Sequence, residues 1–486
     1  MTEPFHTFVP HFTVAERDAV GRSARKRVPR KRQAQWVASG DRPDPVALLE
    51  QQEASRVPGL LPLRHERMGA SAFAFYRGTA IIMASDLASQ PDSGLVVQLC
   101  GDAHLSNFGL YAAPDRVPVF DLNDFDETNP GPFEWDLKRL AASFALAARD
   151  SGFDDQAGRA AARAAAARYR VSMANYAKMN ELAIWYDRVD ASMVDRWAQT
   201  STKTATIKAL RKSFDKAQTR TVWTAVNKLT ASVEGHRRFL DQPPVLVRVP
   251  EDTAARGMML GAMDQYFESL APDRRAILER YEVIDFGHKV VGVGSVGLLA
   301  WVLLLEGRDE SDVLVLQIKQ AQQSVLEPYA SASVFPNHGQ RVVEGQRIIQ
   351  AASDSFLGWL TGRLGREYYV RQLRDMKWSP DPSAFTPSGL VDYAELCGHV
   401  LARAHARSGD SVAISGYMGA STAFDDAIAD FSMAYADLVA DDFVLFQEAV
   451  ASGRLAGGSS SDQLDDYLEA MRNPAPYQGN QSAAPA

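Results

Sequence analysis

Cysteine, leader-like segments and long apolar runs are scarce or missing in this 486-residue sequence. The two cysteines, Cys100 and Cys397, are too few for a disulfide framework or a four-thiolate zinc site, which favours a reducing compartment. The start carries an acid at Glu3 and no basic or apolar stretch, so no signal peptide is expected. The longest uncharged run, 290–305, has 16 residues, whereas a membrane span needs about 20 apolar residues. We therefore expect a cytoplasmic protein without a membrane span.

The sequence also lacks an excess of positive charge, because 52 Lys and Arg residues stand against 60 Asp and Glu residues, a net charge of −8. Proteins that coat nucleic acid are usually basic, so we do not expect a nucleic-acid partner. Hydrophobic residues make up 46% and charged residues 23%, which excludes wholesale disorder and fibrous repeats. The length exceeds one ordinary core and predicts roughly three domain-sized units.

The order of hydrophobic patterns predicts an α+β fold with a mainly helical large lobe and a β-rich small lobe. Helices are expected at 46–55, 72–88, 135–149, 154–186, 339–352, 390–405 and 424–450. Strands are expected at 94–99 and 117–122, in three runs after residue 281, and in two shorter runs on either side of Gly365. The expected units are a basic N-terminal arm (1–65), the first part of the helical lobe (66–150), a helical insertion (151–280), the β-rich lobe (281–378), C-terminal helices (379–472) and an unstructured tail (473–486).

Positive charge is concentrated in two segments. The arm places seven Lys and Arg residues between Arg22 and Arg32, and 200–238 holds nine against two acids. For both we favour a solvated face, with a partner-binding arm and a substrate-facing patch as the respective alternatives. Arg67 and Arg77 are candidates for anion binding, although ion pairing inside the helical body is the favoured interpretation.

The first chemical motif is CGDAHLSN, residues 100–107, directly after an expected strand. Asp102 and Asn107 are five residues apart in a loop. In phosphotransferases this spacing lets the Asp reach the attacking hydroxyl while the Asn carbonyl faces a metal ion on the phosphate side. His104 lies between them and is interpreted as a brace for the loop or as a satisfied loop histidine.

The second motif is FDLNDFDE, residues 120–127. Asp121 closes an expected strand fourteen residues after Asn107, where a second metal-binding carboxylate is needed. Mg²⁺ prefers hard oxygen ligands, and one carboxylate plus one amide oxygen is a sensible contribution from the protein. Asp124 and Asp126 are secondary candidates for the metal site. The alternative interpretation of this acidic cluster is turn chemistry or a cation site without catalysis.

The third motif is GVGSVG, residues 292–297, between two apolar strands. Gly292, Gly294 and Gly297 allow backbone N–H groups to approach phosphate oxygens, and Lys319 at the end of the next strand supplies a point charge for them. A tight turn and a solvated lysine are the alternatives. The three motifs are specific only in combination.

Residues 100–127 resemble the catalytic and metal loops of the protein kinase-like superfamily, most closely aminoglycoside and choline phosphotransferases, whose loop reads His-Gly-Asp-x-His-x-x-Asn. This resemblance implies a kinase-like two-lobe fold, with ATP and Mg²⁺ as cofactors. It makes Asp102 the catalytic base, with His104 beside it, and makes Asn107 and Asp121 the Mg²⁺ ligands, with Asp124 in support. The acceptor would be a hydroxyl of a small molecule or a protein.

The same resemblance assigns the β-rich lobe. Gly292, Gly294 and Gly297 become the loop that covers the phosphates, Lys319 the phosphate-binding lysine, and Glu344 the carboxylate that orients it, with Glu327 as a rival. Segments such as GRSARKRVPRK, FAFYRG, PFEWDLKRLA, QIKQA, VVEGQRIIQAASD and AHARSGD further resemble the bacterial domain of unknown function 2252 family over nearly the whole chain.

Two features depart from the kinase-like pattern. Cys100 replaces the His that opens the loop, so one bracing hydrogen bond must come from elsewhere. The catalytic loop precedes the Gly-rich segment, so the chain must be circularly permuted, and Lys319 and Asp121 must still converge on one metal–triphosphate. A kinase-like pseudoenzyme or regulatory nucleotide-binding module, a nucleotidyl transferase on the same fold, and a dinucleotide-binding unit around 290–305 are the alternatives.

Overall fold

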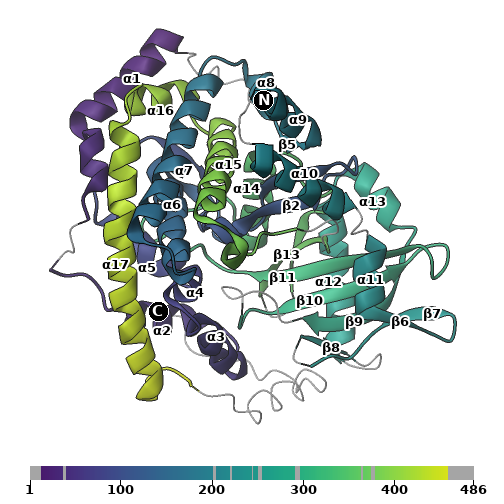
Figure 1. Cartoon of the computed structure of the whole chain (residues 1–486). Coiled ribbons are helices and arrows are strands. Elements are labelled where there is room, and N and C mark those ends of the chain that lie inside the picture. Colours follow the sequence, from purple (N-terminus) through teal and green to yellow (C-terminus); the bar gives the residue numbers. More distant parts are fainter. Residues whose placement is uncertain are drawn as a thin grey trace, which may run out of the picture.

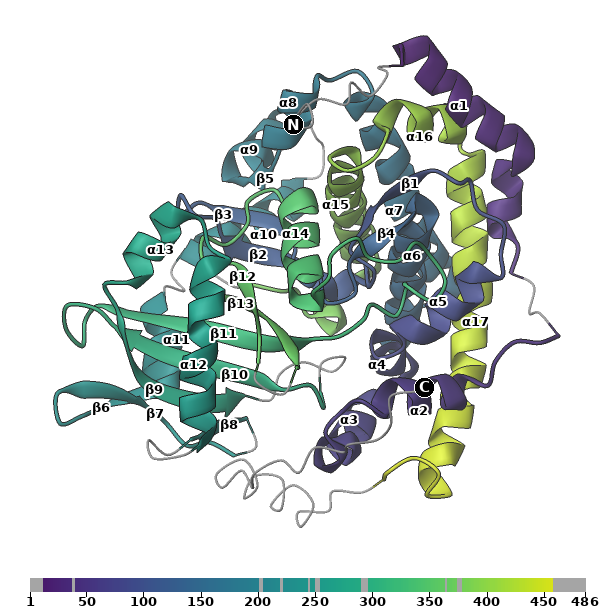
Figure 2. The same ribbon diagram turned by 180° about the vertical axis from the view of Figure 1, so that it is seen from behind.

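The computed structural model describes residues 12–36, 40–200, 204–218, 222–243, 245–249, 254–289, 296–362, 365–373 and 378–457. Helices account for 52% and strands for 17%, so the protein is a mixed α+β protein with several sheets, as expected. Figure 1 shows a helical region on one side and a strand-rich region on the other, and Figure 2 shows the same division from behind.

Long helices form the helical region (Figure 1). Its main helices are α1 (Val14–Arg27), α6 (Phe133–Asp150), α7 (Asp155–Tyr176), α15 (Pro387–Ala406), α16 (Ser411–Met418) and α17 (Ala423–Ala451). On α7, Ala161, Ala162, Ala165 and Ala166 are fully buried. On α15, Gly398 approaches so closely that an added Cβ would lie 2.3 Å from the backbone oxygen of Ala165. Small residues therefore allow α7 and α15 to pack nearly backbone to backbone.

Two expected helices are each divided in the structure. The helix expected at 72–88 forms α4 (Ala72–Arg77) and α5 (Ala80–Ala88), because Gly78, a poor helix former, closes α4. Ser71 caps α4 as expected, accepting a hydrogen bond from the Ala74 N–H. The helix expected at 154–186 ends as α7 at Tyr176, and Asn180 caps a new helix, α8 (Glu181–Tyr186).

The strand-rich region is built on a six-stranded antiparallel sheet with the order β12-β13-β11-β10-β9-β8 among the described residues. Its strands are β8 (Leu246–Arg248), β9 (Glu282–Lys289), β10 (Ala300–Glu306), β11 (Val313–Ala321), β12 (Gly358–Thr361) and β13 (Glu367–Gln372). The runs expected after residue 281 are confirmed as β9, β10 and β11. Leu303, Leu316, Ile318 and Val370 are fully buried on one face of the sheet. The helix α14 (His338–Ile349) lies between β11 and β12 in the chain.

Two small sheets lie between these regions and position the site. They contain β1 (Val96–Leu99) paired with β4 (Asn129–Pro132), and β2 (Phe108–Ala112), β3 (Pro118–Leu122) and β5 (Val189–Asp190). Leu99 pairs with Asn129, and Phe108 pairs with Leu122. The loop 100–107 and the loop 123–128 therefore begin and end at paired strand residues, which holds the two loops side by side.

Further helices and strands complete the described chain. They are α2 (Pro45–Glu53), α3 (Leu61–Met68), α9 (Ala191–Thr200), α10 (Thr204–Gln218), α11 (Val222–Leu229), β6 (Thr230–Val233), β7 (His236–Phe239), α12 (Ala254–Glu268) and α13 (Pro272–Leu278), with short 3₁₀ turns at Arg30–Ala34, Pro58–Leu60, Leu105–Asn107 and Pro382–Ala384. No helix in the part of the chain that the structure describes is long and apolar enough to cross a membrane.

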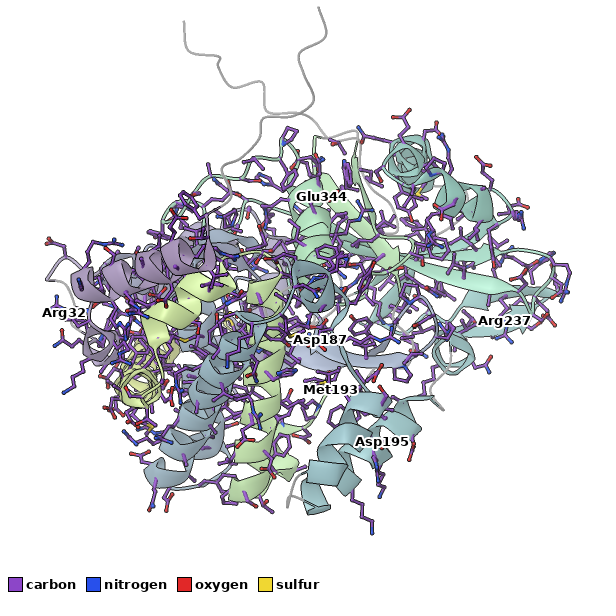
Figure 3. All side chains as sticks on the ribbon, turned by 90° about the horizontal axis from the view of Figure 1, so that it is seen from above. Arg32, Asp187, Met193, Asp195, Arg237 and Glu344 are labelled. Carbon is purple, nitrogen blue, oxygen red and sulfur yellow. The ribbon has the colours of Figure 1, made fainter. Side chains whose placement is uncertain are left out.

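The basic arm is more ordered than a solvated segment. Its helix α1 begins with a capping box at Thr13 and packs against α16. Arg27 donates to the Ser93 carbonyl and Arg30 to the Met418 carbonyl, so part of its positive charge serves packing. In Figure 3, Arg32 and Arg237 lie at opposite ends of the molecule, so the two basic segments of the sequence do not meet in one patch.

Candidate functional site

Asp102 lies in the loop after β1 and is held by an arginine from α6. Its Oδ1 accepts a hydrogen bond from Arg139 Nε at 2.8 Å and lies 2.8 Å from Arg139 Nη2 in the same ion pair, and its side chain is 19% exposed. Burial raises the pKa of Asp102 to about 6, with the Arg139 charge opposing and the Asp124 charge adding to this rise. A carboxylate with such a pKa is ionised at neutral pH and basic enough to accept a proton.

The loop around Asp102 is braced mainly from its backbone. The Asp136 carboxylate accepts the N–H groups of Cys100 at 2.7 Å and Gly101 at 3.1 Å. His405, at the end of α15, lies 3.3 Å from the same carboxylate and bonds Tyr169 through its other ring nitrogen at 2.8 Å. Asp136, itself in contact with His405, therefore supplies the hydrogen bonds to the loop 100–107 that Cys100 cannot provide in place of a His. The sequence pattern did not single out Asp136, although its place early in an expected helix was visible.

His104 does not brace the loop through its side chain as predicted. Its Nε2 lies 3.7 Å from Asp102 Oδ2, beyond hydrogen-bond distance, and its buried Nδ1 has no hydrogen-bond partner in the described part of the chain. Burial, together with the charges of Arg77 and Arg139, lowers the pKa of His104 well below its ordinary value. The His104 ring is therefore a neutral group packed beside Asp102.

Asn107 lies at the other end of the same loop. Its side-chain nitrogen donates to the Asp102 carbonyl at 2.9 Å, so its Oδ1 is directed away from that bond. Its own carbonyl accepts the N–H of Asn123 at 2.9 Å, which ties this loop to the loop 123–128. The Asn107 side chain is thus tied to the backbone of Asp102, and its amide oxygen takes no part in this hydrogen bond.

Lys319 enters the site from β11 and pairs with a carboxylate of the loop 123–128. Its Nζ lies 2.6 Å from Asp126 Oδ2 and 4.0 Å from Asp124 Oδ1, and its side chain is almost fully buried. The Tyr369 hydroxyl donates to Asp126 Oδ1 at 2.6 Å. Burial alone would lower the pKa of Lys319, but Asp126, Tyr369 and Asp124 raise it above the ordinary value, so the lysine is charged.

Asp124 is the carboxylate with spare capacity for a ligand. Its Oδ1 is buried and has no hydrogen-bond partner among the described residues. Its charge raises the pKa of Asp102 and that of Lys319, so it acts electrostatically on both predicted functional groups. A buried oxygen without a partner is costly unless a cation or a donor occupies the site.

Asp121, the predicted metal ligand, has a different role. Its Oδ1 and Oδ2 lie 2.7 and 2.8 Å from Arg403 Nη2, and the Ala351 N–H donates to Oδ2 at 2.7 Å. Both side chains are 1% exposed. Since side chains alternate along β3, the Asp121 carboxylate faces Arg403 of the helical region, whereas Asp124 lies in the loop beyond the strand. Lys319 therefore converges with Asp124 and Asp126 instead of Asp121.

The predicted partner of Lys319 on α14 also differs. Glu344, labelled in Figure 3, pairs with Arg347 at 2.8 Å. Glu327, the rival, lies 3.6 Å from Arg341 Nε. The carboxylate that pairs with Lys319 is Asp126, instead of Glu344 or Glu327. Arg341 of α14 donates to the Asp126 carbonyl at 2.8 Å and so holds α14 against the loop 123–128. The sequence could not reveal this, since the rotation of α14 depends on tertiary packing.

The Gly-rich segment is described only at its end. Gly292 and Gly294 lie outside the described residues. Gly297 has φ +92°, a left-handed conformation that favours glycine, and its carbonyl accepts the Val57 N–H at 2.8 Å. The Arg56 guanidinium donates to the Val296 carbonyl at 2.6 Å. Arg56 and Val57, which follow α2, therefore hold the backbone of residues 296–297 shortly before β10 begins.

The donor set fits Mg²⁺. The Asn107 amide oxygen and the Asp124 carboxylate are hard oxygen atoms of the kind that Mg²⁺ prefers, and Asp124 Oδ1 has no hydrogen-bond partner among the described residues. Within the described residues there is no group of three or more His, Cys, Asp or Glu side chains that could hold a metal. A site with two protein ligands is consistent with this, because Mg²⁺ in phosphoryl-transfer sites takes its other ligands from phosphates and water.

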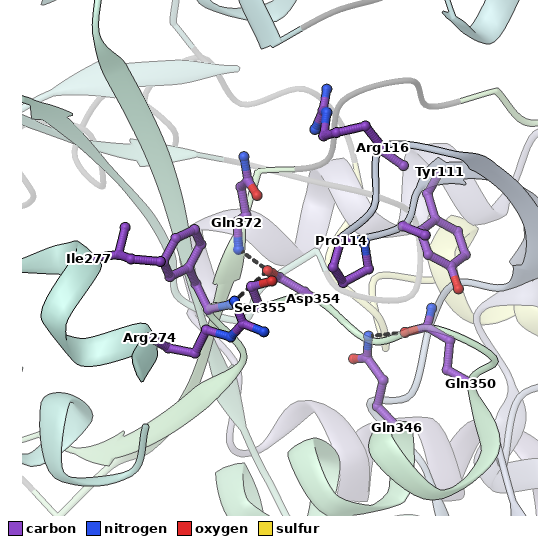
Figure 4. A pocket seen from close by; sticks show the side chains of 13 residues that line it. Tyr111, Pro114, Arg116, Arg274, Ile277, Gln346, Gln350, Asp354, Ser355 and Gln372 are labelled. Atoms are coloured by element: carbon purple, nitrogen blue, oxygen red, sulfur yellow. Dashed lines mark hydrogen bonds between the residues drawn. The ribbon is translucent and has the colours of Figure 1, made fainter. Parts of the chain in front are cut away.

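A separate cavity of about 180 Å³ is lined by residues of the β2–β3 turn, α13, α14 and the segment that follows α14 (Figure 4). Tyr111, Arg116, Arg274, Gln350 and Asp354 are among its lining residues. Asp354 accepts N–H hydrogen bonds from Gln372 and Phe356, so it organises the walls of this cavity. The lining includes none of the candidate residues around Asp102.

These observations define an α+β protein in which two loops of small sheets meet a buried lysine from a six-stranded antiparallel sheet. The chain belongs to a bacterial family described as "uncharacterized protein conserved in bacteria" (DUF2252), which matches residues 56–449. This confirms the family resemblance seen in the sequence. The matched span contains both loops and the six-stranded sheet. No curated protein and no solved structure matches the chain.

Proposed function

We propose that the protein is an ATP- and Mg²⁺-dependent phosphotransferase with a permuted kinase-like arrangement. The observation that carries the proposal is the approach of Lys319 Nζ to Asp126 at 2.6 Å and to Asp124 at 4.0 Å, on a loop tied to the one that carries Asp102. Kinases likewise combine a lysine on the third strand of the small lobe, a metal-binding Asp, and an Asp and Asn of a catalytic loop. Lys319 lies on the third of the strands β9, β10 and β11 in chain order.

The end of α15 supports the permuted order. The Gln98 N–H on β1 donates to Ser408 Oγ at 3.1 Å, and an added Cβ on Gly409 would lie 2.5 Å from the Val97 side chain. The chain leaving α15 therefore passes directly beside the strand that leads into the catalytic loop. A kinase-like chain would continue from that helix into this strand. Here the two segments meet in space, although they are about 300 residues apart.

The chain's own side chains account for the proposed chemistry. Arg139 orients Asp102, which leaves Oδ2 to accept the proton of an acceptor hydroxyl. The hydroxyl oxygen then bonds to the γ-phosphorus of ATP, the bond from that phosphorus to the bridging oxygen breaks, and ADP leaves. Lys319 offers its charge to the phosphate oxygens. Mg²⁺ held by Asn107 and Asp124 would neutralise further charge on the triphosphate.

ADP formation tests this proposal. The wild-type protein and Asp102→Asn are compared with Mg²⁺–ATP and a panel of sugars, amino alcohols and Ser-containing peptides. We expect the wild type to form ADP and the variant to be slower by about 1000-fold, with nearly unchanged affinity for an ATP analogue. Equal rates would contradict the role of Asp102, and absence of ATP binding would contradict the proposal.

The same experiment separates the alternatives. Tight Mg²⁺–ATP binding without ADP in every arm would indicate a regulatory nucleotide-binding module. Release of pyrophosphate in place of ADP would indicate nucleotidyl transfer, because the α-phosphorus would then be attacked.

A further inference from the structure

The helix α4 ends beside the catalytic loop. The Tyr76 carbonyl accepts a hydrogen bond from Arg139 Nη2 at 2.7 Å, and the Tyr76 hydroxyl donates to the Arg139 carbonyl at 2.8 Å. The Arg139 guanidinium lies 3.9 Å from the centre of the Tyr76 ring. Because Arg139 also holds Asp102, the last turn of α4 is fixed next to the proposed catalytic base.

Arg77 follows Tyr76 and is the next positive charge at this place. Its guanidinium acts electrostatically on both Asp102 and His104. Its Nε is buried and has no hydrogen-bond partner in the described part of the chain. Burial lowers the pKa of Arg77, and Asp102 offsets only part of this, because the Asp102 carboxylate is already held by Arg139.

A desolvated guanidinium without a matching anion is unfavourable in a folded protein. The planar fork of Arg matches carboxylates and phosphates, with which it forms two parallel hydrogen bonds. Arg139 forms an ion pair with Asp102, and Lys319 forms one with Asp126, so both of these cations already have a matching anion. Of these three cations, all within the described residues, Arg77 is therefore the one left to serve a ligand.

We propose that Arg77 binds an anionic group, a carboxylate or a phosphate, on the acceptor molecule whose hydroxyl faces Asp102. This inference rests on the proposed function and adds the class of acceptor: a hydroxy acid or a phosphorylated alcohol. Because Arg77 and Asp102 would hold two groups of the same molecule, the anion fixes the hydroxyl for attack.

Anion binding by the full chain tests the inference without knowledge of the natural acceptor. Inorganic phosphate and acetate are titrated calorimetrically into the protein with a non-hydrolysable ATP analogue and Mg²⁺ present, so that the nucleotide's own phosphate site is filled. The variants are Arg77→Met and Arg77→Lys. Arg149→Met is the control, because Arg149 lies at the far end of α6 and pairs with Asp155 and Asp437.

We expect the wild type to bind one of the two anions, which also tells phosphate from carboxylate. Arg77→Met should weaken that binding by roughly 10- to 100-fold, Arg77→Lys by less, and Arg149→Met should leave it unchanged. Equal affinity in the wild type and Arg77→Met, or no binding of either anion by the wild type, would overturn the inference. If Arg77→Met melts earlier than the wild type, Arg77→Lys decides: intermediate affinity supports the inference, and wild-type affinity overturns it.

The outcome is separable from the proposed function. Suppose that the protein has no affinity for the ATP analogue but binds an anion through Arg77 in the absence of nucleotide. This result would support the anion site at Arg77 and contradict the phosphotransferase proposal. Binding of the ATP analogue without any Arg77-dependent anion binding would do the reverse.

Discussion

Two aspartates three residues apart, Asp121 and Asp124, have opposite surroundings. Asp121 is buried in an ion pair with Arg403 and also accepts a backbone N–H. Asp124 Oδ1 is buried without a hydrogen-bond partner among the described residues and lies 4.0 Å from Lys319 Nζ. The first carboxylate supports the fold, and the second is available to a ligand.

This contrast gives a prediction for two matched substitutions. Asp121→Asn should lower the free energy of unfolding by about 3–5 kcal/mol, because Arg403 would stay buried without a counter-charge. Asp124→Asn should change it by less than about 1 kcal/mol but weaken Mg²⁺-dependent binding of an ATP analogue by roughly 10-fold or more. Urea unfolding and calorimetry measure the two effects, and the reverse pattern would restore Asp121 as the metal ligand.

Asp102 gives the proposed reaction a pH dependence. Its pKa is raised by burial from 3.8 to about 6, and the base acts when deprotonated. Therefore kcat/KM should be level above about pH 7 and fall tenfold per pH unit well below about pH 6. The pH profile of ADP formation measures this, and a rate unchanged between about pH 5 and pH 8 would exclude Asp102 as the base.

At the scale of elements, the loop after β1 depends on the backbone of Gly101. This residue has φ +85°, and an added Cβ would lie 2.1 Å from the Glu127 carbonyl oxygen. The tight contact holds the loop 100–107 against the loop 123–128. A glycine at this place is therefore required both by the backbone conformation and by the space.

Gly101→Ala should destabilise the protein by more than about 3 kcal/mol and abolish ADP formation, because strain and overlap combine. Gly152→Ala is the control: Gly152 also has a positive φ, +75°, but nothing lies within 4 Å of an added Cβ. That change should cost only about 1 kcal/mol and leave activity intact. Similar unfolding free energies for the two variants would show that the two loops are not in contact as described.

The sequence predicted those helices and strands whose own residues show an apolar pattern or a capping residue. Apolar runs predicted β3, β9, β10 and β11, and the Ser71 cap predicted the start of α4. The strand β4 (Asn129–Pro132) was missed, because Asn, Pro and Gly carry no strand signal and only the pairing with β1 makes it a strand. The loop residues Asp102 and Asn107 were predictable from their spacing, whereas Asp126 as the partner of Lys319 depends on contacts between distant segments.

At the scale of the whole molecule, the site forms where two distant parts of the chain meet. Lys319 and Asp126 are 193 residues apart in sequence and 2.6 Å apart in space. The helical region supplies Arg139 and Asp136, which hold the loop 100–107, and the six-stranded sheet supplies Lys319. The pairs Arg139–Asp102 and Lys319–Asp126 therefore join residues of the helical region, the two loops and the six-stranded sheet.

Calorimetric titration of a non-hydrolysable ATP analogue tests this convergence most directly. The wild type should bind the analogue only with Mg²⁺ present, and Lys319→Met and Asp124→Asn should each weaken binding by roughly 10-fold or more. Absence of binding by the wild type, or binding that neither substitution nor Mg²⁺ removal changes, would contradict the central claim that these residues form one nucleotide site.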